Sequence, residues 1–216
     1  MKKLTIHWLM LCALLLAISS CSRAEQPQVP EDEPTGENVD SLQGKKILIV
    51  YLSRTKNTKA VAEIIHKEVG GDLVSLELVT PYPENYQQIV AQVSKENETG
   101  FLPPLKTKID SIQKYDLVFL GFPTWGMQLP PPMKSFLSQY DLSGKTVVPF
   151  NTNAGYGIGS SFETVKQLCP DSKVLQGYST KGGVERDGIL YVMEGEKEKE
   201  VQAEVQNWLK KIGFGI

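Results

Sequence analysis

The fold is decided by residues 45–69, KKILIVYLSRTKNTKAVAEIIHKEV. The run at residues 46–52 is rich in aliphatic and β-branched residues, which is typical of a strand buried on both faces of a parallel sheet. A polar loop at residues 53–58 follows this run, and its amide and hydroxyl side chains are good helix caps. The next segment is predicted to be a helix, because its apolar residues fall on one face: Val61, Ile64, Ile65 and Val69.

The same alternation of strand and helix continues to the end of the chain. Further strands are predicted at residues 72–78, 115–121, 145–150 and 173–179, and further helices at residues 86–97, 131–140, 160–168 and around 201–212. We expect Ile89, Val90 and Val93 of the second helix to face inward. Pro149 would remove a ladder bond from the fourth strand, and residues 188–194 form either a short strand or an extended approach to the last helix. Alternating strands and helices imply right-handed βαβ units and a parallel sheet.

The N-terminus has the pattern of an export signal. Two lysines precede an apolar run at about residues 9–18, and that run is too short for a comfortable membrane span. Ile18-Ser19-Ser20-Cys21 resembles the lipobox of bacterial lipoproteins, in which the cysteine is lipidated; the alternative is ordinary signal cleavage with a chance cysteine. We therefore expect a signal at residues 1–20, a lipidated Cys21, and a protein exported and lipid-anchored to a bacterial membrane, on the periplasmic side or the cell surface.

The composition beyond the signal separates a tether from a domain. Residues 22–44 contain three prolines, many charges and few apolar groups, so we expect a disordered tether before a domain at residues 45–216. The formal net charge of −2 shows no basic surplus, and no nucleic-acid partner is predicted. Of the three cysteines, Cys169 is predicted to be a packing residue, since no histidine is a plausible partner for a catalytic thiol. We predict no catalytic residue and no metal site.

Three loops are candidates for a ligand site, because ligands of parallel sheets bind beyond the carboxyl ends of the strands. The first loop, Ser53 to Thr58, leads into a helix N-terminus, where unpaired N–H groups and the helix dipole favour an anion. Its hydroxyls and cations suit a terminal phosphate monoester. An ordinary capped helix start is the alternative, since the same residue types are preferred caps.

The other two loops supply aromatic rings and glycines. Residues 121–130 place Trp125 in a Gly/Pro-rich loop, where the ring either stacks on a flat ligand or plugs the loop onto the domain. Residues 151–159 contain three glycines, which permit close backbone approach to a ligand, and Tyr156 as a second aromatic ring. The three loops together suit a flat heterocycle that carries a phosphate.

At these residues the chain resembles the flavodoxins. The resemblance rests on ILIVYLSRTKNT, TPYPENYQQIV, YDLVFLGFPTWGMQLPPPMKSFL, YDLSGKTVVPFNTNAGYGIGSS and VLQGYSTKGG, which occur in the expected order. It implies an α/β fold: a flavodoxin-like, doubly wound, five-stranded parallel sheet of order 2-1-3-4-5 with helices on both faces, and FMN as cofactor. The family usually has glycine where Lys56 stands. The cofactor-binding residues that the resemblance implies are Ser53, Arg54, Thr55, Lys56, Asn57, Thr58, Pro123, Thr124, Trp125, Gly126, Thr152, Asn153, Ala154, Gly155, Tyr156 and Gly157.

Three functions are consistent with this resemblance. The first is an FMN-binding electron-transfer protein, tethered to a membrane only through its lipid, that serves redox partner proteins. The second is an FMN-dependent NAD(P)H reductase of quinone-like acceptors. The third is a binding module that keeps the fold but has lost FMN, and Lys56 is the feature that favours it. Simple electron transfer needs no acid–base residue, because the chemistry belongs to the flavin.

Overall fold

The sheet is built around the apolar run that opens the domain. The computed structural model describes residue 42 and residues 44–216, so the predicted signal, Cys21 and nearly all of the predicted tether lie outside the described residues. The strands are β1 (Ile47–Tyr51), β2 (Asp72–Ser75), β3 (Leu117–Pro123), β4 (Thr146–Asn153), β5 (Lys173–Val174) and β6 (Tyr178–Lys181). All strand pairs are parallel, and the order β2-β1-β3-β4-β5 confirms the predicted doubly wound sheet.

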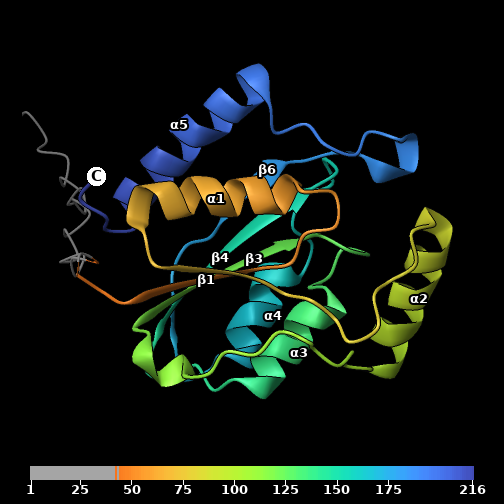
Figure 1. The fold of residues 1–216 in the computed structure, drawn as a ribbon, viewed down its shortest axis with the longest axis horizontal. Coiled ribbons are helices and arrows are strands. Elements are labelled where there is room, and N and C mark those ends of the chain that lie inside the picture. The colour runs from red at the N-terminus through yellow and green to blue at the C-terminus, as the bar shows by residue number, and fades with distance from the viewer. Residues whose placement is uncertain (1–41, 43) are drawn as a thin grey trace, which may run out of the picture. The chain divides into compact units, whose positions relative to one another are not determined.

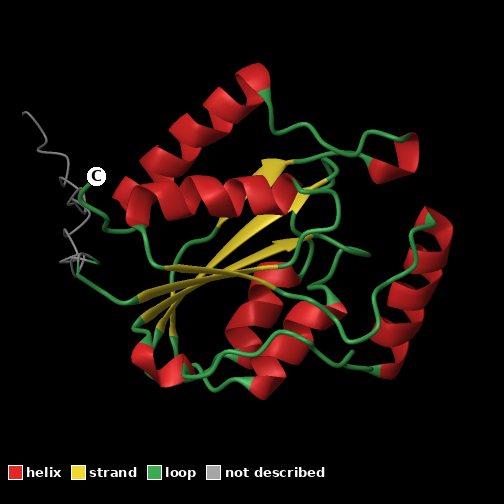
Figure 2. Ribbon diagram, viewed as in Figure 1, coloured by secondary structure: helices red, strands yellow, loops and turns green. Residues whose placement is uncertain are grey.

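Helices cover both faces of this sheet (Figure 1 and Figure 2). They are α1 (Asn57–Val69), α2 (Tyr86–Thr99), α3 (Pro131–Gln139), α4 (Ser161–Leu168) and α5 (Gly195–Lys211), with short 3₁₀ turns η1 (Ile112–Lys114) and η2 (Glu185–Asp187). Side chains alternate across each strand, so Ile49 of β1 packs with α1 and α5, whereas Val50 packs with α3 and α4. No helix in the described part of the chain is long and apolar enough to cross a bilayer.

Helix α2 departs from the expected arrangement. Figure 1 shows it beyond the ends of the strands, whereas α3 and α4 lie across the face of the sheet. Among the described residues, no α2 side chain belongs to either core cluster of the sheet. Ile89 and Val93 are buried as predicted, but Val90 is 48% exposed, so its predicted inward position is wrong. The reason is that α2 turns its apolar side toward a cavity and not toward the sheet.

The edge strands also differ from the prediction. β2 ends at Ser75 and not at Leu78, because Leu78 instead forms a single antiparallel bridge with Leu105. β4 extends past the predicted end to Asn153, with Pro149 in its interior. The predicted fifth strand is two strands, β5 and β6, which pair with successive parts of β4.

The break between β5 and β6 accommodates the proline. The Val147 carbonyl accepts a bond from the Leu175 N–H at 2.9 Å, so residues of that parity in β4 direct their polar groups toward β5 and β6. Pro149 has this parity, and its missing N–H therefore faces residues 175–177, where neither strand pairs with β4. Residues 188–194 contain no strand and approach α5 in an irregular path, which settles the alternative that the sequence left open.

Candidate functional site

A cavity of about 700 Å³ lies where the loops after β1, β3 and β4 meet. This volume is in the range of small-molecule and cofactor sites, roughly 300–1,000 Å³. The lining includes most of the residues predicted from sequence: Arg54, Thr55, Asn57, Thr58, Pro123, Thr124, Trp125, Gly126, Thr152, Asn153, Ala154, Tyr156 and Gly157. Ser53, Lys56 and Gly155 are not among the lining residues. The fold thus brings the three predicted loops to one cavity, while the role of each residue toward a ligand stays a prediction.

The N-terminus of α1 offers the backbone N–H groups of Asn57 and Thr58 to this cavity, whereas the next two N–H groups already have partners. The Lys59 N–H donates to Ser53 Oγ at 3.1 Å, and the Ala60 N–H donates to the Lys56 carbonyl at 2.9 Å. Among the contacts of the described residues, none accepts from the N–H groups of Asn57 and Thr58. The first N–H groups of a helix have no intrahelical partner, and they favour an anion. We call the turn that presents the N–H groups of Asn57 and Thr58 the cradle. Ser53 accepts a bond from the Lys59 N–H in this turn, although Ser53 does not line the cavity.

The side chains of Asn57 and Thr58 hold the cradle in place. Thr58 Oγ1 lies 2.8 Å from Thr152 Oγ1, and both residues are buried, so this bond joins the loops after β1 and β4. The Asn57 amide nitrogen donates to Thr55 Oγ1 at 2.8 Å and to the Leu190 carbonyl at 2.6 Å. Its oxygen accepts from the Val192 N–H at 3.1 Å. The Asn57 side chain is thus committed to the protein, and its backbone N–H is the group left for a ligand.

Lys56 occupies a backbone conformation that suits glycine. Its φ angle is 67°, in the left-handed region, immediately before the first turn of α1. The residue is exposed and does not line the cavity. The lysine therefore costs backbone strain at this turn, but its side chain does not crowd the cradle.

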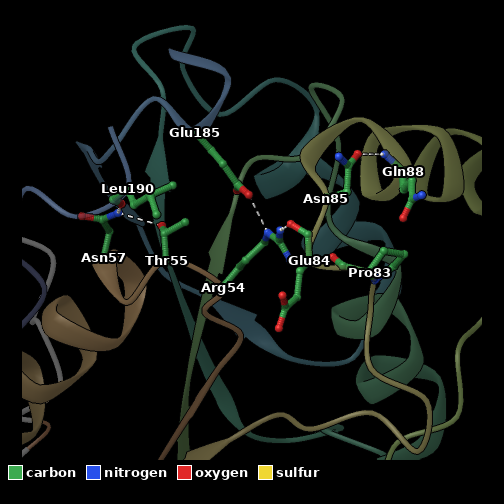
Figure 3. A network of polar contacts seen from close by, with 9 residues as sticks. All are labelled: Arg54, Thr55, Asn57, Pro83, Glu84, Asn85, Gln88, Glu185 and Leu190. Carbon is green, nitrogen blue, oxygen red and sulfur yellow. Dashed lines mark hydrogen bonds and ion pairs between the residues drawn. The ribbon is translucent and has the colours of Figure 1, made fainter. Parts of the chain in front are cut away.

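Arg54 joins three segments around the cavity (Figure 3). Its Nε donates to Glu185 Oε1 at 2.7 Å, and its Nη1 donates to the Pro83 carbonyl at 2.9 Å. Its Nη2 donates to the Glu84 carbonyl. The sequence suggested that Arg54 supplies positive charge to a bound phosphate. In the structure the Glu185 carboxylate neutralises the guanidinium, and the carbonyls of Pro83 and Glu84 accept bonds from its two Nη atoms. Arg54 thereby fixes the residues that lead into α2.

Trp125 is both packed and available to the cavity. Its ring meets the Tyr82 ring edge to face, with centroids 5.4 Å apart, and it also packs against the core cluster beneath α3. The Tyr82 hydroxyl donates to a carboxylate oxygen of Glu96 in α2. Burial, followed by the bond to Glu96, raises the pKa of Tyr82 far above its usual value, so the phenol stays protonated. The structure therefore shows the packing of Trp125 against the domain and its place in the cavity lining, while stacking of its ring on a ligand stays a prediction.

The loop after β4 folds around one amide side chain. Asn153 Oδ1 accepts from the N–H groups of Gly155 at 2.8 Å and Gly157 at 3.1 Å. Thr124 Oγ1 donates to the Gly157 carbonyl at 3.0 Å, and the Thr124 N–H donates to the Thr152 carbonyl at 2.9 Å. These bonds fasten the loops after β3 and β4 to each other. The bond between Thr58 and Thr152 then ties this pair of loops to α1.

Sequence reasoning missed two parts of the cavity wall. One is α2, and the other is the segment after β6, which contributes Gly182, Gly183, Val184, Glu185 and Arg186. The pair of glycines directly after a strand was a usable signal for the second part, because it stands at the same sheet edge as the three predicted loops. The amphipathic pattern of α2 gave no comparable signal, since it does not reveal what the apolar side faces.

Metal-ligating side chains form no cluster among the described residues, and the cysteine there lies apart from the cavity. No group of His, Cys, Asp and Glu side chains in the described part of the chain could hold a metal ion. Cys169 is buried away from the cavity wall, and burial raises its pKa to about 11. Its predicted role as a packing residue is confirmed.

The chain is similar to flavodoxins and to proteins named flavoproteins. The sequence pattern of the flavodoxin family matches residues 46–195. A flavodoxin from Nostoc sp. is 25% identical over 148 residues, which cover 67% of this chain and 72% of the relative. A structure from Bacteroides eggerthii that is named a flavoprotein is 30% identical, with a TM-score of 0.63 over 78% of this chain and 98% of that one. A flavoprotein from Lactobacillus acidophilus, solved in complex with FMN, is 23% identical, with a TM-score of 0.57 over 67% of this chain and 98% of that one, and shows the same fold.

Proposed function

The chain belongs to the flavodoxin family, and we propose that it is an electron-transfer protein that carries FMN in the cavity at the carboxyl edge of the sheet. The observation that carries the proposal is the meeting of three loops, each suited to a different part of FMN, at one cavity of about 700 Å³. When bound, FMN supplies the electron-accepting and electron-donating ring, and the protein supplies binding, orientation and exclusion of water.

The cradle at α1 fits the phosphate of FMN. The free N–H groups of Asn57 and Thr58 point from a helix N-terminus, the position at which backbone donors and the helix dipole both favour an anion. The hydroxyl of Thr55 lines the cavity beside them. Lys56 is exposed and stays outside the cavity, which removes the main argument that the chain has lost FMN.

The opposite part of the cavity fits a flat ring. Trp125 lines it and is braced from behind by Tyr82, so the indole has little freedom to turn away. Tyr156 also lines the cavity and is 65% exposed, which leaves its ring available to cover the outer side of a ligand. We expect these two residues to shield the FMN ring from water, and the Asn153 loop to present backbone groups to its edge.

The binding proposal is tested by titrating the purified protein with FMN and following flavin fluorescence. We expect strong quenching that saturates at one equivalent. The variant Thr58→Val keeps the shape of the side chain but breaks the bond to Thr152, and it should weaken FMN binding about tenfold, the effect of losing roughly 1.4 kcal/mol. The matched control is Thr164→Val, which removes an exposed hydroxyl of α4 away from the cavity. Equal FMN affinity in both variants would contradict the proposed cradle.

We propose further that the domain is exported and held at a bacterial membrane through Cys21. The support is the sequence alone: two lysines, a short apolar run and Ile18-Ser19-Ser20-Cys21, followed by a polar stretch before the domain. One acyl chain binds a membrane only marginally, so stable anchoring requires more than one. In a bacterial host, Cys21→Ser should move the protein from the membrane fraction to the soluble fraction. Mass spectrometry of the N-terminal peptide of the membrane-bound wild type should show an acylated Cys21, and an unmodified one would contradict the proposal.

A further inference from the structure

Helix α2 carries a buried carboxylate whose partners in the described part of the chain are uncharged. Glu96 is 6% exposed, and none of the ion pairs between described residues involves it. Its two oxygens accept hydrogen bonds instead, one from the Tyr82 hydroxyl and the other from Gln92 Nε2 at 2.8 Å. Burial of a carboxylate costs free energy unless hydrogen bonds satisfy it, and bonds to a charged group are roughly twice as strong as neutral ones. Glu96 therefore fixes the Tyr82 ring firmly.

Tyr82 connects this carboxylate to the cavity wall. The Tyr82 and Trp125 rings stand at 88° to each other with their centroids 5.4 Å apart, which is a preferred edge-to-face arrangement of two aromatic rings. Trp125 lines the cavity, whereas Tyr82 and Glu96 do not. The carboxylate and the phenol can therefore influence a ligand only through the indole.

The backbone on both sides of this ring pair is held by hydrogen bonds. The Trp125 N–H donates to the Gln128 carbonyl at 3.3 Å, and the Gln128 N–H donates back to the Trp125 carbonyl at 3.1 Å, so the loop after β3 makes a tight turn here. On the other side, Arg54 donates to the carbonyls of the two residues that follow Tyr82. With both backbones fixed, the freedom left to the indole is rotation of its side chain. The Tyr82 ring limits that rotation.

The chain contains a matched arrangement away from the cavity. The Tyr178 hydroxyl donates to Glu204 Oε2 at 2.6 Å, and the Tyr178 and Trp208 rings have their centroids 5.5 Å apart. Tyr178 and Trp208 belong to the core cluster that also contains residues of α1 and α5, and neither lines the cavity. Because the groups are the same, removal of the Tyr178 hydroxyl measures what such a bond contributes to packing.

We propose that Glu96 and Tyr82 are positioning residues for the flavin ring: Glu96 fixes Tyr82, and Tyr82 holds the indole of Trp125 against the ring of FMN. The inference rests on the proposed function, because Trp125 covers a flavin ring only when FMN occupies the cavity. The face of an aromatic ring is negative, so an indole that covers the flavin disfavours the electrons that reduction adds. The position of the indole therefore affects the reduction potential of bound FMN as well as its affinity.

The test compares Tyr82→Phe with Tyr178→Phe in the full chain, since each variant keeps the ring and loses only the hydroxyl. We expect Tyr82→Phe to weaken the binding of oxidised FMN about tenfold in a fluorescence titration. If the affinity for reduced FMN stays the same, the two-electron potential of bound FMN rises by about 30 mV, the equivalent of that factor. Glu96→Leu should act like Tyr82→Phe. Glu96→Gln should stay within about twofold of the wild type, because its amide oxygen can still accept from the Tyr82 hydroxyl.

A measurement without FMN separates this inference from the proposed function. In the ¹⁵N-labelled protein free of FMN, the indole N–H resonance of Trp125 should move in Tyr82→Phe and Glu96→Leu and stay in place in Tyr178→Phe. FMN affinity and potential that are equal in Tyr82→Phe and Tyr178→Phe overturn the positioning role, even if the resonance moves. Absence of FMN binding in the wild type overturns the proposed function instead, and the indole resonance then decides by itself whether Glu96 and Tyr82 hold Trp125.

Discussion

Replacement of Arg54 by methionine should loosen α2 while leaving the sheet intact. The substitution keeps most of the apolar stem but removes the bonds to Glu185, Pro83 and Glu84. A hydrogen bond to a charged group contributes roughly 1.5–3 kcal/mol. The Arg54 and Glu185 side chains are 21% and 20% exposed, and water can replace part of what is lost at the carbonyls. We therefore expect a local loss of about 2–3 kcal/mol, less than the sum of three such bonds.

Amide hydrogen exchange measures this loss where it occurs. Local opening free energies set exchange rates, and 1.4 kcal/mol corresponds to a factor of ten. The amides of α2 should exchange roughly 30- to 150-fold faster in Arg54→Met, whereas those of β1 and β3 should not change. Arg186→Met is the matched control, because Arg186 pairs with the adjacent Asp187 and both side chains are largely exposed. Unchanged exchange in α2 of Arg54→Met would refute the reasoning that Arg54 holds this helix.

Three further substitutions or reactions test other features of the structure. Lys56→Gly should raise the free energy of unfolding by about 0.5–1 kcal/mol, since relief of the left-handed strain exceeds the entropy cost of glycine, and urea denaturation that shows a decrease would contradict this. Gly159→Ala should lower the free energy of unfolding by about 2–4 kcal/mol. A Cβ at this position would lie 2.0 Å from the Met127 carbonyl oxygen, and the φ angle of 55° is unfavourable for alanine. Urea denaturation that shows wild-type stability would refute this contact. At pH 8 iodoacetamide should label Cys169 far more slowly in the folded than in the unfolded protein. The reason is that burial raises the pKa of the thiol to about 11 and only the thiolate reacts. Equal labelling rates, measured by mass spectrometry of the peptide that contains Cys169, would contradict this prediction.

The features that the sequence predicted are those recorded in local patterns. The apolar run of β1 and the polar loop after it are adjacent in the chain, so the strand, the helix start and the edge of the sheet at which the cavity lies follow from one stretch. The stripe of α5, with Trp208 at its centre, is buried in the core as its spacing predicts. Parallel topology then places the three loops at one edge without further information.

The features that the sequence did not predict depend on distant residues. Arg54 and Glu185 are 131 positions apart, and nothing near Arg54 in the chain indicates that its charge is already balanced. The spacing of α2 defines an apolar side, but only the path of the chain decides whether that side meets the sheet or a cavity. Pro149 fits inside β4 because β5 and β6 separate beside it, which is a property of the neighbouring strands.

The central claim is that FMN binds with its phosphate at the N-terminus of α1. It is tested most directly by following the backbone amide resonances of the ¹⁵N-labelled protein during a titration with FMN. We predict that the amides of Asn57 and Thr58 shift strongly downfield and saturate at one equivalent, and that the indole resonance of Trp125 shifts with them. FMN that leaves these three resonances unmoved at high micromolar concentration would contradict the account.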